Sequence, residues 1–282
     1  MTEKDCIGHD VAVIILNYKT WQETLDEIRM MSQISDINCD FIVVDNCSPN
    51  DSYEQLAKAS KLLNYTLLKS DSNGGYAKGN NIGLRYAKKH GYHYGWIMNN
   101  DILFESNFSL SRLLGVFQQA DDIAVVNPDV YSADGKLYNR DSKRWTFSDL
   151  SFGMYRYKKT GREIFDQGGW GYIYRPQGCC MVLDLQKCSE VGFFDTHTFL
   201  YCEEPILAER LLNKGYRCAC DISNKIVHNH SYTVHSSLDR QRVINTHLNS
   251  FMYYLTAYRK FSGFKLAVCM LFQKIKLTYL EK

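Results

Sequence analysis

The feature of the sequence that most restricts the fold is an alternation of short apolar runs and amphipathic segments near the N-terminus. The apolar runs are Val11–Leu16, Phe41–Val44 and Tyr65–Leu68, and a stretch long enough for an amphipathic helix follows each of them. A third helix is predicted from about Tyr76 to His90, followed by a strand at Tyr94–Met98. This order is typical of parallel strands joined by crossover helices, so the sequence predicts an α/β domain that begins βαβαβαβ.

The second half of the sequence is less regular. A helix and a strand are predicted at Asn107–Gln119 and Ile123–Val126, after which Tyr131–Arg175 loses periodicity and becomes rich in Gly, Tyr, Trp and charged residues. Long segments of this kind in compact domains tend to be lids or binding loops, and we expect this one to bind an acceptor substrate. The remaining elements predicted for the body are a strand at Cys179–Leu183, a helix at Glu203–Asn213 and a strand at Lys225–Val227.

Composition excludes several classes of protein. With 282 residues, of which 45% are hydrophobic and 23% charged, the chain is predicted to form a globular body without covalent crosslinks. A formal net charge of +2 gives no reason to expect a nucleic-acid-binding face, and the ten cysteines form no Cys-x-x-Cys pair for zinc. Because Met1–Asp10 is polar and no apolar run approaches the ~20 residues of a membrane span, a cytoplasmic location is predicted.

Polar residues gather where the predicted strands end. Asn17 follows the first strand, Asp45 and Asn46 follow the second, and the triplet Asn99–Asp101 follows the fourth. Ligands of open parallel sheets bind at the carboxyl ends of the strands, so this edge is predicted to bind a nucleotide. The Asp45 carboxylate is suited to accept hydrogen bonds from a nucleobase or ribose; the alternative is a turn in which Asp45 bonds its own backbone.

A glycine-rich segment, Asn73–Gly83, leads into the third predicted helix. Gly74 and Gly75 permit close backbone approach where the helix begins and its free N–H groups can face phosphate or base, and Asn80 follows in the same helix. For Gly83, which costs roughly 1 kcal/mol relative to alanine, helix-on-sheet packing is the simpler explanation. The segment contains neither the phosphate loop nor the G-x-G-x-x-G fingerprint, which argues against kinase-like and dehydrogenase functions.

A metal site is predicted at the end of the fourth strand. Asp101, together with Asn99 and Asn100, offers hard oxygen ligands suited to Mg²⁺ or Mn²⁺ held jointly with a diphosphate. The motif His228-Asn229-His230-Ser231 follows the strand Lys225–Val227, and the neutral imidazole of either histidine is a candidate ligand for the same ion. The alternatives are a polar turn for the triplet and a buried histidine without a metal.

Two adjacent carboxylates, Glu203 and Glu204, precede Pro205 and an apolar helix. Acidic residues at a helix start are common because they complement the helix dipole. A carboxylate there is also a candidate general base, because a sugar hydroxyl that attacks an anomeric carbon must lose its proton as the new bond forms.

Taken together and in order, these motifs resemble the family 2 glycosyltransferases, over about residues 11–231. The motifs that carry the resemblance are Val13–Tyr18, Val43–Asn46, Asn73–Ala77, Asn99–Asp101, Gly192–Asp195, Tyr201–Glu204 and His228. Within that family the chain looks most like the bacterial rhamnosyltransferase and capsule or O-antigen group, where a strand-ending Asn-Asn-Asp replaces the usual Asp-x-Asp.

The resemblance implies a GT-A fold, with a nucleotide-binding mixed sheet flanked by helices, a divalent metal and a nucleotide-diphosphate sugar as donor. It assigns base binding to Asp45, metal binding to Asp101 and His228, and the general base to Glu204. Asn17 and Gly75 would line the nucleotide. Relatives usually carry Glu-Asp at the base, whereas this chain has Glu203-Glu204-Pro205, so the choice between the two glutamates stays open.

Gly178 begins a segment that in such relatives lies near the donor sugar and the acceptor. This makes Cys179 and Cys180 candidates for the site lining, but not nucleophiles, because a single inverting displacement needs no covalent intermediate.

The leading functional prediction is transfer of a hexose or deoxyhexose, with inversion, from a nucleotide donor to a surface-glycan acceptor. A sugar-nucleotide pyrophosphorylase is one alternative, although it needs a basic glycine-rich loop where this chain has Asn17–Trp21. A non-catalytic nucleotide-sugar-binding protein is the other.

The chain is predicted to divide into a catalytic domain, residues 1–237, and a helical tail, residues 238–282. The tail carries Lys and Arg among apolar residues, a pattern that suits anionic lipid and hence a lipid-linked acceptor at the inner face of the membrane. Packing on the catalytic body or a homodimer contact is the alternative.

Overall fold

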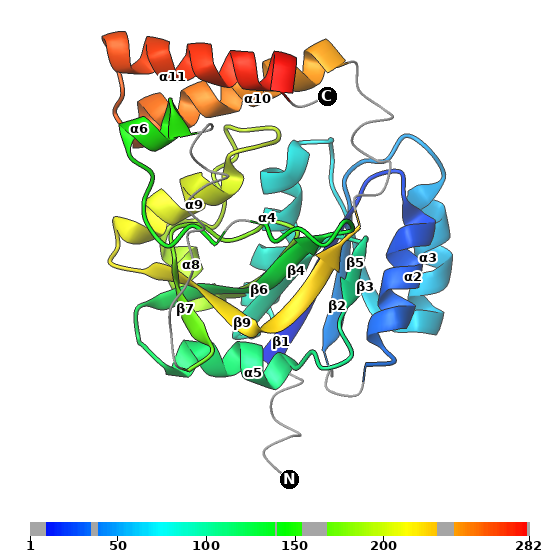
Figure 1. The fold of residues 1–282 in the computed structure, drawn as a ribbon. Helices are drawn as coiled ribbons and strands as arrows, with labels where there is room; N and C mark the ends of the chain where they lie inside the picture. Colours follow the sequence, from blue (N-terminus) through cyan, green and yellow to red (C-terminus); the bar gives the residue numbers. More distant parts are fainter. Residues whose placement is uncertain (1–9, 35–38, 139, 154–167, 230–239, 281–282) are drawn as a thin grey trace.

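The computed structural model describes residues 10–34, 39–138, 140–153, 168–229 and 240–280. In this part of the chain nine strands form one mixed sheet with helices on both faces, which confirms the predicted α/β class (Figure 1). The strands are β1 Val11–Asn17, β2 Asp40–Asp45, β3 Tyr65–Lys69, β4 Tyr94–Met98, β5 Ile102–Phe104, β6 Ile123–Ser132, β7 Trp170–Ile173, β8 Cys180–Asp184 and β9 Arg217–His228. The helices of the body are α2 Trp21–Met31, α3 Ser52–Leu63, α4 Gly75–Lys89, α5 Leu110–Gly115, α6 Phe147–Leu150, α8 Leu185–Glu190 and α9 Glu203–Leu212.

The strand order is β3-β2-β1-β4-β8-β6-β9-β5, with β7 paired to β9. The first four strands of this order are mutually parallel, as the sequence predicts, whereas β8 runs antiparallel to both β4 and β6. The second half of the sheet is therefore mixed: β6 and β9 run in the same direction as the first four strands, whereas β8, β5 and β7 run in the opposite direction. The carboxyl ends of β1, β2 and β4 share one edge, which carries the polar residues found in the sequence.

Alternate residues of β1 enter two separate cores. Val11, Val13 and Ile15 pack with α2, α3 and α5 on one face, and Ala12 and Ile14 pack with α4, α8 and α9 on the other. Both sides of this strand are buried, which explains its unbroken apolar sequence.

The glycines inside α4 are explained by packing. A Cβ on Gly83 would lie 2.5 Å from Ile14 Cγ2, and one on Gly79 would lie 2.4 Å from Leu16 Cδ1. Any larger residue at either position would push α4 off the sheet. Gly79 therefore has the same role that the sequence suggested for Gly83.

Strand β9 is much longer than the predicted Lys225–Val227. It pairs with β6 along Arg217–His228, but the register jumps because Pro128 faces Asp221 whereas Asp129 faces Lys225. Asp221 accepts hydrogen bonds from Ser223 N and Asn224 Nδ2, so the polar residues of this bulge satisfy one another. These residues break the apolar alternation, and the sequence pattern therefore revealed only the last part of the strand.

The tail forms two helices, α10 Arg240–Tyr253 and α11 Gly263–Ile275, each continued by a π-helical turn. The pair lies across one end of the molecule (Figure 1). A third apolar cluster joins it to the body, with Phe251, Leu255 and Cys269 of the tail packed near Ile206 of α9. The inner face of the tail thus packs on the rest of the chain. This packing is one of the alternatives that the sequence analysis gave for the tail. Among the described residues, no helix combines the length and the apolar character that crossing a bilayer requires.

Asp195, from the Gly192–Asp195 motif, ties the tail to the body. Its carboxylate accepts hydrogen bonds from Tyr253 Oη at 2.8 Å, from Tyr258 Oη and from His197 N. Burial of the group opposes its ionisation, but the hydrogen bonds from Tyr258, His197 and Tyr253 outweigh burial and lower the pKa of Asp195 to about 2.

We expect Asp195→Asn to lower the free energy of unfolding by about 1 kcal/mol at neutral pH, after allowance for solvent screening. Because the folded-state pKa lies below the ordinary 3.8, this stabilisation is present above pH 3.8 and is lost as the pH falls through about 2. Urea denaturation of both proteins at a series of pH values measures the difference. Asp71→Asn, at an exposed position, is the control, and an equal loss of stability there would remove the role of Asp195.

Candidate functional site

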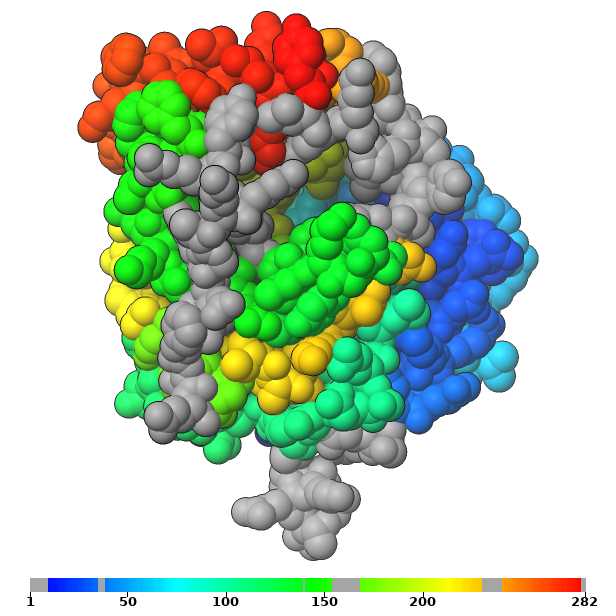
Figure 2. Space-filling model, in the orientation of Figure 1, coloured from blue at the N-terminus to red at the C-terminus, as the bar shows by residue number. Residues whose placement is uncertain are grey.

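A cavity of about 860 Å³ lies between the sheet edge, the irregular region, α9 and the tail. Figure 2 shows this face of the molecule, with the tail helices along its upper border. The residues from the sheet edge and α9 that line the cavity are Tyr76, Asn99, Gly178, Cys179, Glu203, Glu204 and His228. Those from the irregular region and the tail include Tyr138, Asp141, Trp145, Asp149, Arg175, His247, Phe272 and Lys276.

Asp101 and His228 lie side by side at the edge of this cavity. Strand β5 starts directly after Asp101 and pairs antiparallel with the end of β9, so that Ile102 faces His228. Asn229 N also donates to Asp101 O at 3.0 Å. As a result Asp101 Oδ1 is 3.1 Å from His228 Nε2, although the two residues are far apart in the chain.

The two asparagines of the triplet point in different directions. Asn99 lines the cavity, and its Nδ2 lies 3.3 Å from His228 Nε2. Asn100 Nδ2 donates instead to the hydroxyls of Thr20 and Thr24, at 2.8 and 3.0 Å. Asn99 is therefore placed beside Asp101 and His228, whereas Asn100 fastens the loop to the start of α2.

The donor set around Asp101 suits a divalent cation that also binds a ligand. Two donors on neighbouring octahedral positions, each at about 2.1 Å from the ion, are about 3 Å apart, close to the observed 3.1 Å. The described residues contain no cluster of three or more His, Cys, Asp or Glu side chains that could hold a metal. An ion here would thus take its other ligands from a diphosphate or from water. His230, the second histidine of the motif, lies outside the described residues.

A buried carboxylate that the sequence analysis missed lies beneath Asp101. Glu27 of α2 is only 5% exposed, and burial raises its pKa to about 8, with a backbone hydrogen bond from Ile102 opposing the shift and the charge of Asp101 adding to it. Glu27 is therefore neutral at neutral pH. Its position three residues after the buried Thr24 and one before Ile28 places it on the apolar face of α2, which is the signal that could have revealed it.

The two glutamates at the start of α9 have different surroundings. Glu203 is 4% exposed, and burial together with the charge of Glu204 raises its pKa well above the ordinary value. Glu204 is only partly buried, lines the cavity, and accepts a hydrogen bond at Oε1 from Gly178 N at 3.2 Å. Glu204 is thus the better-placed proton acceptor of the pair.

Gly178 allows α9 to approach the segment before β8. A Cβ at this position would lie 2.7 Å from Glu204 Oε1 and 3.2 Å from Tyr76 Oη. Tyr76 Oη donates to Gly178 O at 2.6 Å, which fixes the segment from the other side. Of the two adjacent cysteines, Cys179 lines the cavity, whereas Cys180 is fully buried and accepts from Trp96 Nε1. Burial raises the pKa of both thiols, so neither is set up as a nucleophile.

Asp45 and Asn17 are both fully buried at the ends of β2 and β1. Asp45 Oδ1 accepts from Asn17 Nδ2 at 2.9 Å and from Ser48 Oγ at 2.6 Å, and its Oδ2 accepts from Ser48 N at 3.0 Å. Asp45 therefore organises the local turn that the sequence analysis kept as the alternative. The two side chains hold each other and the turn rather than face the cavity.

The glycine-rich turn closes against two buried amides. Asn46 Nδ2 donates to Asn73 Oδ1 at 3.0 Å and to Gly75 O at 3.3 Å, and Asn80 Nδ2 donates to Tyr76 O at 3.0 Å. Within the described part of the chain, Oδ1 of Asn46 and Oδ1 of Asn80 have no hydrogen-bond partner. Buried acceptors without a donor are costly and point to water or a ligand at this edge.

The backbone at this turn requires glycine at only one of its two positions. Gly75 has φ +79°, and a Cβ there would lie 1.8 Å from the Phe199 carbonyl oxygen. A Cβ on Gly74 would meet only the flexible Lys78 side chain, at 2.2 Å from Cδ. Gly75 thus brings the start of α4 against the loop that precedes α9.

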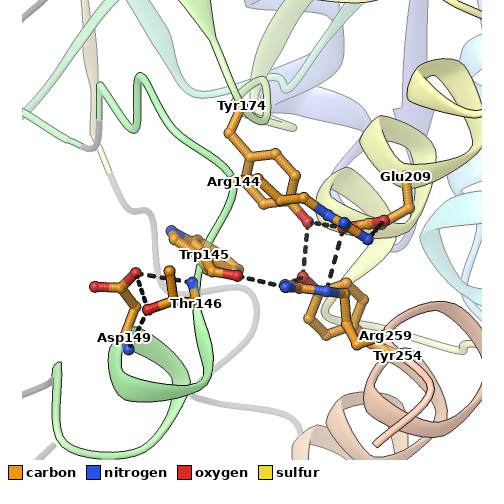
Figure 3. Close-up of polar contacts among 8 residues, drawn as sticks. All are labelled: Arg144, Trp145, Thr146, Asp149, Tyr174, Glu209, Tyr254 and Arg259. Carbon is orange, nitrogen blue, oxygen red and sulfur yellow. Dashed lines mark hydrogen bonds and ion pairs between the residues drawn. The ribbon is translucent and has the colours of Figure 1, made fainter.

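The helix that carries Glu203 and Glu204 is anchored by an ion cluster (Figure 3). Glu209 of α9 is 2% exposed and accepts from Arg144 Nε at 2.8 Å and from Tyr174 Oη at 2.6 Å. Arg259 of the tail lies 3.5 Å from the same carboxylate and donates to Tyr254 Oη. The cluster joins α9, the irregular region and the tail, so the three walls of the cavity are mutually fixed.

Comparison with known proteins identifies the family of the chain. Residues 10–183 match the family model described as glycosyl transferase family 2. The chain belongs to glycosyl transferase family 2. Among curated proteins it is 25% identical over 195 residues to the low-salt glycan biosynthesis hexosyltransferase Agl10 of Haloferax volcanii. That match covers 69% of this chain but only 59% of the relative. The chain therefore matches less than two thirds of the length of the relative.

Solved glycosyltransferases share the fold. GalNAc-T7, solved with UDP, GalNAc and Mn²⁺, superposes with a TM-score of 0.63 at 14% identity. The match covers 87% of this chain and 47% of the GalNAc-T7 chain. The mannosyltransferase PcManGT of Pyrobaculum calidifontis, solved with GDP-Man and Mn²⁺, superposes with a TM-score of 0.58 at 16% identity. The match covers 95% of this chain and 69% of PcManGT. These likenesses confirm the expected GT-A fold of this family 2 chain.

Proposed function

We propose that the protein is an inverting glycosyltransferase that moves a hexose or deoxyhexose from a nucleotide-diphosphate sugar to a glycan acceptor. The observation that carries the proposal is that Glu204 and His228 line the same cavity, and that Asp101 Oδ1 lies 3.1 Å from His228 Nε2. Membership of family 2 and the similarity to a hexosyltransferase support the reaction class.

In the proposed reaction, Asp101 and His228 would hold Mg²⁺ or Mn²⁺, with the donor diphosphate supplying further oxygen ligands. When bound, the ion neutralises the charge that develops on the leaving nucleoside diphosphate. Glu204 accepts the proton of the acceptor hydroxyl. At the same time the hydroxyl oxygen of the acceptor forms a bond to the anomeric carbon, and the bond between the sugar and the phosphate breaks. Attack from the face opposite the leaving group inverts the configuration. Burial and the charge of Glu204 raise the pKa of Glu203, which supports Glu204 as the base of the pair.

We place the nucleotide over the ends of β1, β2 and β4. The unpaired acceptors of Asn46 and Asn80, beside Gly74 and Gly75, support this position because a nucleobase or ribose can supply donors. Asp45 and Asn17 contribute by shaping the turn under the base rather than by facing the solvent.

We place the acceptor between the irregular region and the tail. Trp145, which lines the cavity, offers an aromatic ring of the kind that packs against sugars. The Arg175 guanidinium lies over this ring, 5.1 Å from its centre, and also lines the cavity. The Haloferax volcanii relative is named for glycan biosynthesis, which supports a glycan as the acceptor of this chain.

Thermal denaturation with a panel of nucleotide sugars, each with and without Mn²⁺, tests the proposal. The cognate donor at a hundredfold excess over its Kd is expected to raise Tm by roughly 5 °C, and only when Mn²⁺ is present. Turnover of that donor distinguishes a transferase from a non-catalytic binding protein. A protein that no nucleotide sugar stabilises, with or without metal, would contradict the proposed function.

A further inference from the structure

The tail is positively charged, whereas the rest of the chain has a net negative charge. Residues 240–280 contain no Asp or Glu and seven basic residues, whereas the whole chain has a net charge of only +2, so the remainder carries −5. The basic residues are Arg240, Arg242, Arg259, Lys260, Lys265, Lys274 and Lys276. Arg259 belongs to the buried cluster and Lys276 lines the cavity, but the other five are exposed. The tail therefore presents a cationic surface on a nearly neutral protein.

An exposed apolar stripe runs along α11 beside these cations. Phe264 and Leu271 are 78% and 57% exposed, and their spacing of seven residues places them on one face of the helix. Val268 and Ile275, which are partly exposed, extend the same face. Tyr279 in the turn that follows is 70% exposed. Large apolar side chains on one side of an outer helix mark a contact surface.

The opposite side of α11 belongs to the cavity and to the tail core. Cys269 is fully buried in the cluster with Phe251, and Phe272 lines the cavity and packs against Phe152 with ring centres 4.8 Å apart. Figure 1 shows α11 as the outermost element at its end of the molecule. One helix thus separates the cavity from whatever covers the apolar stripe.

We propose that the outer face of α11 docks on an anionic lipid bilayer, with Phe264 and Leu271 in the interface and the lysines at the headgroups. Charge complementarity favours this occupant: apolar residues flanked by cations, with no acidic residue in the segment, fit an anionic surface. A second copy of the chain fits poorly, because a twofold contact would bring two equally basic surfaces together. Docking would set the cavity beside the membrane, where a lipid-linked acceptor is found. The link to such an acceptor rests on the proposed function, whereas the docking itself does not.

Co-flotation of the full chain with lipid vesicles tests the inference. Binding is expected to vesicles of phosphatidylcholine mixed with phosphatidylglycerol, to weaken with added salt, and to be much weaker on phosphatidylcholine alone. The pair Lys265→Gln and Lys274→Gln should lower the partition coefficient roughly 30-fold, because each cation contributes a factor of about five at an anionic surface. The pair Phe264→Ser and Leu271→Ser should lower it at least about tenfold.

The matched control is Lys61→Gln with Leu62→Ser on α3, where Leu62 is 85% exposed, and it should bind like the wild type. Equal binding to both kinds of vesicle, or wild-type binding by the α11 variants, would overturn the inference. Two results together would assign the surface to a second copy of the chain. The wild type would be a dimer in light scattering that does not bind vesicles, and the double variant Phe264→Ser, Leu271→Ser would be a monomer. Donor-dependent stabilisation measured without vesicles separates these outcomes from failure of the proposed function.

Discussion

Glu204→Gln is expected to lower the rate of sugar transfer by roughly two to four orders of magnitude while the donor still binds. Glutamine keeps the size of the side chain and can still accept the hydrogen bond from Gly178 N, so the start of α9 should retain its structure. What glutamine cannot do is take a proton from the acceptor hydroxyl. The loss should therefore appear in kcat, with the donor-induced rise in Tm unchanged.

Glu203→Gln is the matched control for this experiment. Because burial and the neighbouring charge raise the pKa of Glu203 and so favour its protonated form, which glutamine resembles, we expect less than about a tenfold loss of rate. Rates for both variants under donor saturation, with unfolding curves to show that each is folded, decide between the two glutamates. If Glu203→Gln were the inactive variant and Glu204→Gln the active one, the assignment would have to be exchanged.

The parallel half of the sheet could be predicted from sequence because its strands are apolar on both faces. Val11–Leu16 and Tyr94–Met98 were predicted almost to the residue, since their helices cover them and no solvent-facing position interrupts the pattern. Because the carboxyl ends of parallel strands lie at one edge, the sequence alone predicts that Asn17, Asp45 and Asp101 share that edge.

The mixed half could not be predicted in the same way. Strand β5 has only three residues, too few to show a period of two, and the bulge at Asp221–Asn224 hid most of β9. Yet it is the pairing of Ile102 with His228 that brings the metal-ligand candidates together. Sequence spacing could name those residues but could not give the contact between them.

The depth of individual side chains was also beyond the sequence. The prediction that Asp45 binds the base did not include its burial: the side chain is fully buried and accepts hydrogen bonds from Asn17 and Ser48, contacts that the sequence pattern does not give. Glu203 and Glu204 are adjacent in sequence and both line the cavity, and only the turn of α9 decides that Glu203 is buried whereas Glu204 is partly exposed.

Asp101→Asn is expected to raise the Mn²⁺ concentration that donor binding requires and to reduce kcat/KM on the order of 100-fold or more. The asparagine oxygen is a neutral and weaker ligand than carboxylate, so Mn²⁺ must be raised to reach half-maximal activity. His228→Gln should shift the Mn²⁺ requirement in the same direction, because Oδ1 of Asp101 and Nε2 of His228 lie 3.1 Å apart. Titration of activity and of Tm with Mn²⁺ at fixed donor measures both effects.

Glu27→Gln controls for the loss of a carboxylate near the metal site. Burial raises the pKa of Glu27 to about 8, so at pH 7 the native side chain is already neutral and its replacement should leave the Mn²⁺ titration unchanged. A selective effect at Asp101 and His228 would then reflect metal coordination rather than the electrostatics of the region. An Asp101→Asn protein with the wild-type Mn²⁺ titration would instead show that the cation, if the reaction uses one, binds elsewhere.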